Sequence, residues 1–147
     1  MRAAARGPLR VMFPMVTDVE DWDAAMEVVE RCRQRLRERG VSFNEDTSFG
    51  VMLSVPSACL TAEEFVAHGC GFFVIGTNDL TQYTHAVDRE LAPAEHYYRP
   101  ASKAMKKLIR MVMDTAKQGN VPVTICGLAV GNPANATQYL QLSLIHI

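Results

Sequence analysis

The 147-residue sequence lacks several features that would place it outside the ordinary globular proteins. Its charges nearly balance, with 15 Lys and Arg against 16 Asp and Glu, and no basic stripe interleaves with aromatic residues, so nucleic acid is not expected as a partner. No apolar run reaches the roughly 18 residues of a membrane span, and the basic N-terminus has no apolar core typical of a signal peptide. The composition therefore predicts one folded domain of a cytoplasmic protein with no membrane segment.

Cysteines are few, and their spacing excludes the common cysteine-based sites. The four are Cys32, Cys59, Cys70 and Cys126, and they form neither a CxxC pair nor a metal-type spacing. We expect reduced thiols. Cys32 falls on the apolar stripe of a predicted helix and is expected to be structural.

Apolar periodicity predicts strands that alternate with helices. Strands are expected over residues 9–15, 49–55, 71–75 and 121–126, and helices over residues 19–39, 61–67 and 102–119, with a last helix beginning at Asn132 and Pro133. This order indicates parallel βαβ units. Such units form either a small open α/β sheet or about half of an eight-unit barrel, which needs about 250 residues. The pattern alone does not choose between these two architectures.

The helix expected over residues 19–39 has clear start and stop signals. Thr17 and Glu20 have the spacing of a capping box, and Gly40 can supply the positive φ that ends a helix. Its apolar stripe comprises Val19, Trp22, Met26, Val29, Cys32 and Leu36. The spacing of these residues, three to four apart, predicts a helix with one buried face.

Two polar residues directly follow the third predicted strand. In parallel α/β folds, reactive groups gather at the C-terminal ends of strands. Asn78 and Asp79 combine an amide with a carboxylate, which suits Mg²⁺ or a phosphate, although Asn-Asp is also common in turns. Residues 76–101 show no strong period and are expected to form a long loop, and loops of that length are often functional.

Three further residues could carry chemistry, each with an ordinary structural alternative. Arg89 can bind phosphate or carboxylate through two hydrogen bonds, or it is a solvated surface charge. Arg10 lies in an apolar strand and needs a partner or an anionic ligand, although its place near the start of the strand is far from the expected reactive edge. Cys126 ends the fourth strand and can act as a general acid or nucleophile, or it is a small buried hydrophobe.

Several segments together resemble a known family. They are MFPM at residues 12–15, GVM-x-x-x-P at 50–56, FF-x-IGTNDLTQYT-x-AVDR at 72–89 and CG-x-A at 126–129. They are similar to the C-terminal phosphoenolpyruvate-binding barrel of the PEP-utilising enzymes, from about residue 2 to residue 141. Tyr83-Thr84 and residues 86–89 favour the enzyme I group, the phosphoenolpyruvate–protein phosphotransferases of the bacterial sugar phosphotransferase system, over pyruvate phosphate dikinase and PEP synthase. The resemblance implies an α/β fold, a partial (β/α)₈ TIM barrel with about four βα units.

The resemblance also implies a chemistry. Phosphoenolpyruvate would bind with Mg²⁺, its phosphoryl group would pass to a histidine on a separate domain and then to a phosphocarrier protein, and pyruvate would be released. Asp79 matches a Mg²⁺ ligand and Asn78 a phosphate contact. Arg10 and Arg89 match phosphate-side arginines, and Cys126 matches the acid that protonates the enolate carbon. Members of this group are typically homodimers, which we expect of the full-length parent.

The sequence departs from the family pattern at two acidic positions. Ser54 stands where the family has a glutamate metal ligand, and Leu128 stands where Cys-Gly is followed by glutamate. These changes leave open a second hypothesis, a non-catalytic relative that keeps the binding pocket. Residues 1–141 are expected to be the PEP-binding domain fragment, and residues 142–147 a non-native tail derived from a sequencing adapter. We expect the 147-residue chain alone to be inactive.

Overall fold

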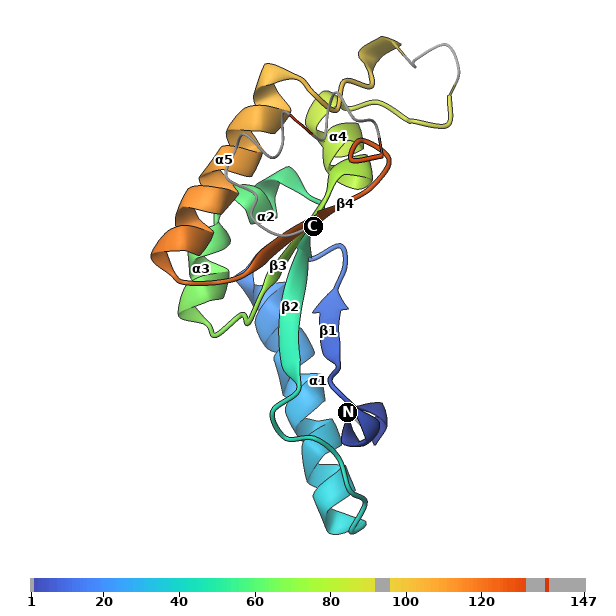
Figure 1. Ribbon diagram of the computed structural model, residues 1–147, viewed down its shortest axis with the longest axis vertical. Helices are drawn as coiled ribbons and strands as arrows, with labels where there is room; N and C mark the ends of the chain where they lie inside the picture. Colours follow the sequence, from blue (N-terminus) through green and yellow to red (C-terminus); the bar gives the residue numbers. More distant parts are fainter. Residues whose placement is uncertain (1, 92–95, 132–136, 138–147) are drawn as a thin grey trace.

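The computed structural model describes residues 2–91, 96–131 and 137 of the chain, and four parallel strands form its centre (Figure 1). The strands are β1 (Arg10–Phe13), β2 (Ser48–Leu53), β3 (Phe73–Gly76) and β4 (Val123–Cys126). The helices are η1 (Arg2–Arg6), α1 (Val19–Glu38), α2 (Pro56–Leu60), α3 (Ala62–Ala67), α4 (Thr77–His85) and α5 (Lys103–Gln118). The sheet order is β1-β2-β3-β4, with every pairing parallel. The predicted α/β fold is confirmed, and the four-stranded sheet is open rather than closed into a barrel.

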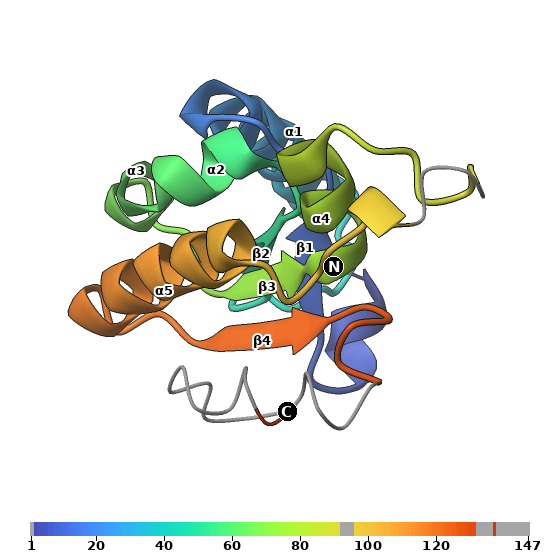
Figure 2. The same ribbon diagram turned by 90° about the horizontal axis from the view of Figure 1, so that it is seen from above.

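The two faces of the sheet differ in what covers them. Helices α1, α2, α3 and α5 lie along one face (Figure 2). The strand residues buried with them are Phe49, Val51, Leu53, Phe73, Ile75, Val123 and Ile125. Because side chains alternate across a strand, the residues between these positions face the other side, where Met12 and Thr124 are exposed. The core therefore lies between the sheet and its helices.

Helix α1 begins and ends close to the predicted positions, but its cap and its second half differ from expectation. Asp18 is the N-cap and accepts a 3.1 Å hydrogen bond from the Asp21 amide, so the capping box predicted at Thr17 is wrong by one residue. Gly40 has the expected positive φ of 60°. Cys32 is exposed, because a 20-residue helix of about 30 Å outruns strands of four to six residues. Cys32 therefore does not belong to the core, and Figure 1 shows the second half of α1 extending beyond the sheet.

The segment predicted to be a long loop contains a helix. Residues 77–85 form α4, whose first residue follows β3 directly. No side chain caps its start, but Thr77, Leu80 and Thr81 are fully buried, and Ala86 ends it in the left-handed conformation with φ 50°. Three threonines give this segment low helix propensity. Tertiary burial decides its conformation, which is why the sequence pattern missed it.

The remaining elements follow the predictions with small shifts. Ser102 caps α5 as expected, accepting a hydrogen bond from the Met105 amide. The second strand ends at Leu53, two residues earlier than predicted, and Pro56 starts α2, a short helix absent from the prediction. The expected last helix at Asn132 lies outside the described residues, as does the proposed tail. None of the helices that the structure describes has the length and apolar character needed to cross a membrane.

Candidate functional site

The C-terminal ends of three neighbouring strands meet at one edge of the sheet. Gly76, at the end of β3, pairs in register with Cys126, at the end of β4. Ser54 follows the last residue of β2, and a Cβ placed on Gly76 would lie 3.5 Å from the Cβ of Ser54. Helix α4 starts at this point, so Asn78 and Asp79 lie in its first turn. Four positions singled out in the sequence are therefore brought to the same edge by the parallel register: Ser54, Asn78, Asp79 and Cys126.

Two hydrogen bonds join the start of α4 to the end of β4. The Thr77 hydroxyl donates to the Cys126 carbonyl oxygen at 2.9 Å, and the Leu128 amide donates to Asn78 Oδ1 at 2.8 Å. We call these two bonds the α4–β4 contact. Gly127 lies between them with φ 113°, and a Cβ there would approach Thr77 Oγ1 to 2.3 Å. Only glycine fits this position, both for its backbone conformation and for the space available.

The α4–β4 contact also orients the Asn78 amide. Its carbonyl oxygen accepts from Leu128, and no hydrogen bond from its Nδ2 group occurs among the described residues. The amide group has two N–H donors. Asn78 can therefore donate to an anionic ligand while it remains bonded to β4.

Asp79 and Arg89 form an ion pair beside this contact. Arg89 Nη1 donates to Asp79 Oδ1 at 2.8 Å, and the two side chains are 35% and 37% exposed, respectively. Arg89 reaches Asp79 because the chain reverses after Ala86, which ends α4. The pair combines a carboxylate with a guanidinium at the edge of the site, so it can serve a cation and a phosphate at adjacent positions.

Tyr98 belongs to the same group of residues, although the sequence analysis did not identify it. Its hydroxyl donates to the Asn78 carbonyl oxygen at 3.4 Å. Burial raises its pKa, and a side-chain hydrogen bond with Thr81 lowers it in part. No sequence signal distinguishes Tyr98 from the exposed Tyr97 beside it. Only the return of the chain over α4 places Tyr98 at the site.

Cys126 is partly buried and lies within electrostatic range of Asp79. Burial raises the pKa of its thiol, and the negative charge of Asp79 raises it further. At neutral pH the group is therefore a protonated thiol, which suits a proton donor better than a nucleophile. The structure thus brings the predicted thiol to the same edge as Asn78 and Asp79.

The donor set at this edge contains one carboxylate for a metal ion. Ser54 is fully buried, and its hydroxyl faces Met15 Sδ at 3.8 Å. Among residues 2–91, 96–131 and 137, no group of three or more His, Cys, Asp or Glu could hold a metal. Mg²⁺ commonly keeps several waters and takes one or two carboxylates together with substrate phosphates. Asp79 therefore fits a magnesium ion that arrives with a phosphate ligand, rather than a metal held by protein groups alone.

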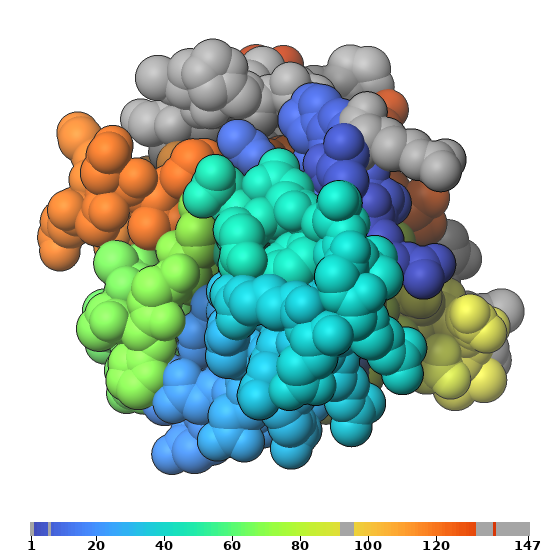
Figure 3. Space-filling model, turned by 90° about the horizontal axis from the view of Figure 1, so that it is seen from below, coloured from blue at the N-terminus to red at the C-terminus, as the bar shows by residue number. Residues whose placement is uncertain are grey.

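Arg10 does not join the other predicted site residues. It is the first residue of β1, at the opposite end of the sheet, and its guanidinium lies 5.6 Å from the centre of the Phe72 ring. This contact between an exposed arginine and a buried ring accounts for a charged residue at this strand position. The end of the molecule away from the site is formed largely by the end of α1 and the segment leading into β2, which are cyan in Figure 3.

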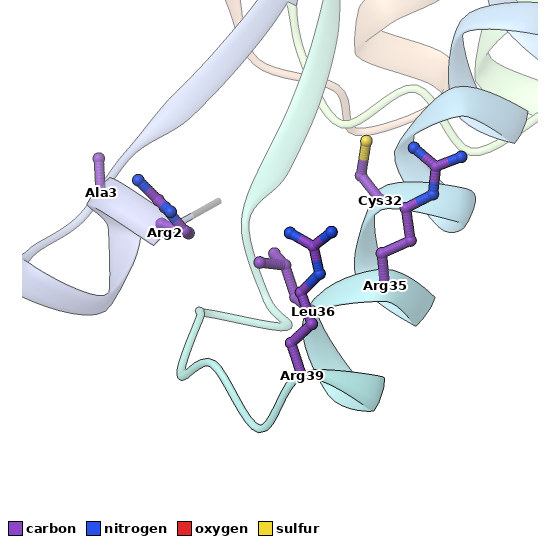
Figure 4. A pocket seen from close by; sticks show the side chains of 6 residues that line it. All are labelled: Arg2, Ala3, Cys32, Arg35, Leu36 and Arg39. Atoms are coloured by element: carbon purple, nitrogen blue, oxygen red, sulfur yellow. The ribbon is translucent and has the colours of Figure 1, made fainter.

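A hollow of about 540 Å³ lies near that end, between η1 and the second half of α1. Arg2, Arg35 and Arg39 line it together with Cys32 (Figure 4). Arg35 and Arg39 lie at the C-terminal end of α1, where positive side chains stabilise the negative end of the helix dipole. The same dipole would disfavour a bound anion there, so we do not assign a ligand site to this hollow.

Comparison with known proteins gives a consistent result. Residues 1–147 match the family model described as "PEP-utilising enzyme, PEP-binding domain". The chain is similar to proteins named phosphoenolpyruvate-protein phosphotransferase, with 41% identity for that of Haemophilus influenzae, 35% for Enterococcus faecalis and 34% for Mycoplasma capricolum. Each match covers 98% of this chain and 25% of the relative. The chain therefore spans about a quarter of the length of these relatives.

Proposed function

Because this chain belongs to the family of PEP-utilising enzymes through their PEP-binding domain, we propose that it binds phosphoenolpyruvate at the C-terminal edge of β2, β3 and β4. In this proposal it is the substrate-binding part of a phosphoenolpyruvate-dependent protein phosphotransferase. The observation that carries the proposal is the convergence of the Asn78 amide, the Asp79–Arg89 pair and the Cys126 thiol on one edge. An anion, a cation and a developing carbanion would each find a suitable partner there.

Asn78 and Arg89 would hold the phosphate. The Nδ2 group of Asn78 can donate to one phosphate oxygen, because its Oδ1 is already bonded to Leu128. The guanidinium of Arg89 can turn from Asp79 toward the phosphate and donate two parallel hydrogen bonds. Asp79 would then become available to a magnesium ion.

Asp79 would hold Mg²⁺ through its carboxylate, in company with oxygen atoms of the substrate phosphate. When bound, the ion would spread the charge of the transferring phosphoryl group. The positive charge of Arg89 would also stabilise the negative charge of this phosphoryl group. The P–O bond would break as a P–N bond forms to a histidine on another domain, and the electron pair of the broken bond would remain on the enolate of pyruvate.

Cys126 would complete the reaction by protonating carbon. Its raised pKa keeps the proton on sulfur at neutral pH, and a positioned thiol can pass that proton to the enolate carbon. The products would be pyruvate and a thiolate, which regains a proton from solvent. The half-buried position of the thiol would limit competing protonation by bulk water.

Ser54 supports a second candidate function, a domain that binds the substrate without catalysing transfer. Its hydroxyl is neutral, buried and directed toward Met15, so it offers Mg²⁺ far less than a carboxylate would. In this alternative, phosphoenolpyruvate would bind through Asn78 and Arg89 with little dependence on the metal.

Calorimetric titration with phosphoenolpyruvate, with and without MgCl₂, tests both candidates. The first predicts binding that Mg²⁺ strengthens and that Arg89→Gln weakens at least about tenfold, which corresponds to about 1.4 kcal/mol. Arg110→Gln, an equal charge change on the exposed face of α5, should leave binding unchanged. Binding independent of Mg²⁺ favours the second candidate. Equal affinities of wild type and Arg89→Gln would contradict both.

A further inference from the structure

Thr77 is a buried polar residue at the site that the proposed mechanism does not use. Its side chain has no exposed surface, although it lies between two residues of the site edge, Gly76 and Asn78. Buried hydroxyls need a hydrogen-bond partner, and the partner of Thr77 lies across the sheet edge. Its hydroxyl donates to the carbonyl oxygen of Cys126 at 2.9 Å.

The geometry around this bond restricts the end of β4 on the side that faces α4. Gly127, the next residue, has no room for a side chain because Thr77 Oγ1 would lie 2.3 Å from its Cβ. One residue further, the Leu128 amide is bonded to Asn78. Thr77 thus contacts the peptide that carries the thiol-bearing residue and the glycine that follows it. We infer that Thr77 is a positioning residue, whose hydroxyl fixes the Cys126 backbone and thereby directs the thiol toward the site.

The hydrogen bonding of Thr81 provides an internal comparison. Thr81 is also fully buried on α4, and its hydroxyl bonds to the Thr77 carbonyl at 2.6 Å. That bond stays within one helix, as is common for threonine hydroxyls, and the Thr81 side chain otherwise interacts with Tyr98 rather than with β4. The bond from Thr77 instead joins α4 to β4, through two residues that are 49 positions apart in the sequence. Loss of the Thr77 hydroxyl should therefore affect Cys126, whereas loss of the Thr81 hydroxyl should not.

This inference rests on the proposed function in one respect only: the proposed function explains why the position of the thiol matters. Its test measures the thiol itself and needs no substrate. If Thr77 controls the thiol while phosphoenolpyruvate does not bind, the positioning inference stands and the proposed function fails. If substrate binds while Thr77 has no effect on the thiol, the reverse holds.

The experiment measures alkylation of each cysteine of the 147-residue chain by iodoacetamide at pH 8, with peptide mass spectrometry. Cys32 is exposed, so its alkylation rate is the reference for an accessible thiol. Cys59 is buried, so its labelling reports unfolding. Thr77→Val keeps the size of the side chain but removes the hydroxyl. We expect it to raise the rate at Cys126 at least about fivefold relative to Cys32, while Cys59 stays protected. Thr77→Ser should restore a rate within about twofold of wild type.

The controls decide between positioning and a general loss of stability. Thr81→Val removes an equally buried hydroxyl from the same helix and should leave the Cys126 rate unchanged. An unchanged Cys126 rate in Thr77→Val overturns the inference, as does an equal increase in Thr81→Val or a failure of Thr77→Ser to restore the rate. Where Cys59 also becomes labelled in Thr77→Val, the Cys59 rate is subtracted from the Cys126 rate as the contribution of global unfolding. A remainder no larger than the wild-type Cys126 rate overturns the inference, and a larger remainder supports it.

Discussion

Asp79 accepts a 2.8 Å hydrogen bond from Arg89, ten residues further along the chain, so the proposed cation ligand and the proposed phosphate ligand are paired with each other. Each side chain keeps the other in place and neutralises its charge. A ligand that brings both a metal ion and a phosphate can separate the pair without leaving either charge unpartnered. The pair therefore suits a site that receives Mg²⁺ and phosphate together.

The first prediction concerns the carboxylate. Asp79→Asn should abolish the strengthening of phosphoenolpyruvate binding by Mg²⁺, because an amide is a weak magnesium ligand. Stability should change by no more than about 1 kcal/mol, since a pair this exposed is screened by solvent. Calorimetry and urea unfolding measure the two effects. Asp88→Asn, a nearby exposed carboxylate, is the matched control, and an Asp79→Asn variant that keeps the magnesium effect would refute the assignment.

The second prediction concerns the departure from the family at Ser54. Ser54→Glu places a carboxylate in a fully buried position and should lower the melting temperature by about 5 °C or more without metal. Addition of MgCl₂ should recover part of this loss, because the ion would pair with the new carboxylate. Ser42→Glu, at an exposed position near the other end of the molecule, should show neither effect. A Ser54→Glu variant that does not respond to Mg²⁺ would show that position 54 lies outside the metal environment.

The third prediction concerns the glycine in the α4–β4 contact. Gly127→Ala should destabilise the fold by roughly 1–3 kcal/mol, from backbone strain together with a clash against Thr77. Gly69 also has a positive φ, of 79°, but open space surrounds it. Gly69→Ala should therefore cost only about 1–2 kcal/mol, from the left-handed conformation alone. Urea unfolding measures both, and a cost at Gly127 no larger than at Gly69 would argue against tight packing there.

The fourth prediction concerns the pH dependence of the Cys126 thiol. Its pKa lies above the ordinary value of 9.0, because burial and the charge of Asp79 both disfavour the thiolate. The thiolate is the reactive form, so the alkylation rate should reach half of its maximum above pH 9. Asp79→Asn removes a negative charge and should move this midpoint to lower pH, whereas Asp88→Asn should not. A midpoint that Asp79→Asn leaves in place would mean that the two groups do not interact.

The fifth prediction concerns Tyr98. Tyr98→Phe removes the hydroxyl that reaches Asn78 and should weaken phosphoenolpyruvate binding about two- to tenfold, the usual range for one hydrogen bond. Tyr97→Phe makes the same chemical change at a residue that is 55% exposed and should have no effect. Calorimetry compares the two variants, and equal affinities would place Tyr98 outside the site.

The parts of the fold that were predicted correctly are those with a strong local signal. The apolar stripe and the glycine at position 40 located α1, and four apolar runs located the parallel strands. The motif that contains Asn78, Asp79 and Arg89 indicated the family without any tertiary information. Periodicity and motif spacing are properties of neighbouring residues, so the sequence contains them completely.

Tertiary structure alone decided the features that depend on distant contacts. Helix α4 forms because burial of Leu80 and its neighbours outweighs a poor helix propensity, and Cys32 is exposed because α1 is longer than the strands. The placement of Arg10 at the opposite end of the sheet from the site, and the return of Tyr98 to Asn78, follow from strand direction and chain reversal. The sequence determined which residue types are available for the proposed chemistry. The parallel register and the path of the chain decided which of them meet, because that depends on contacts between residues tens of positions apart.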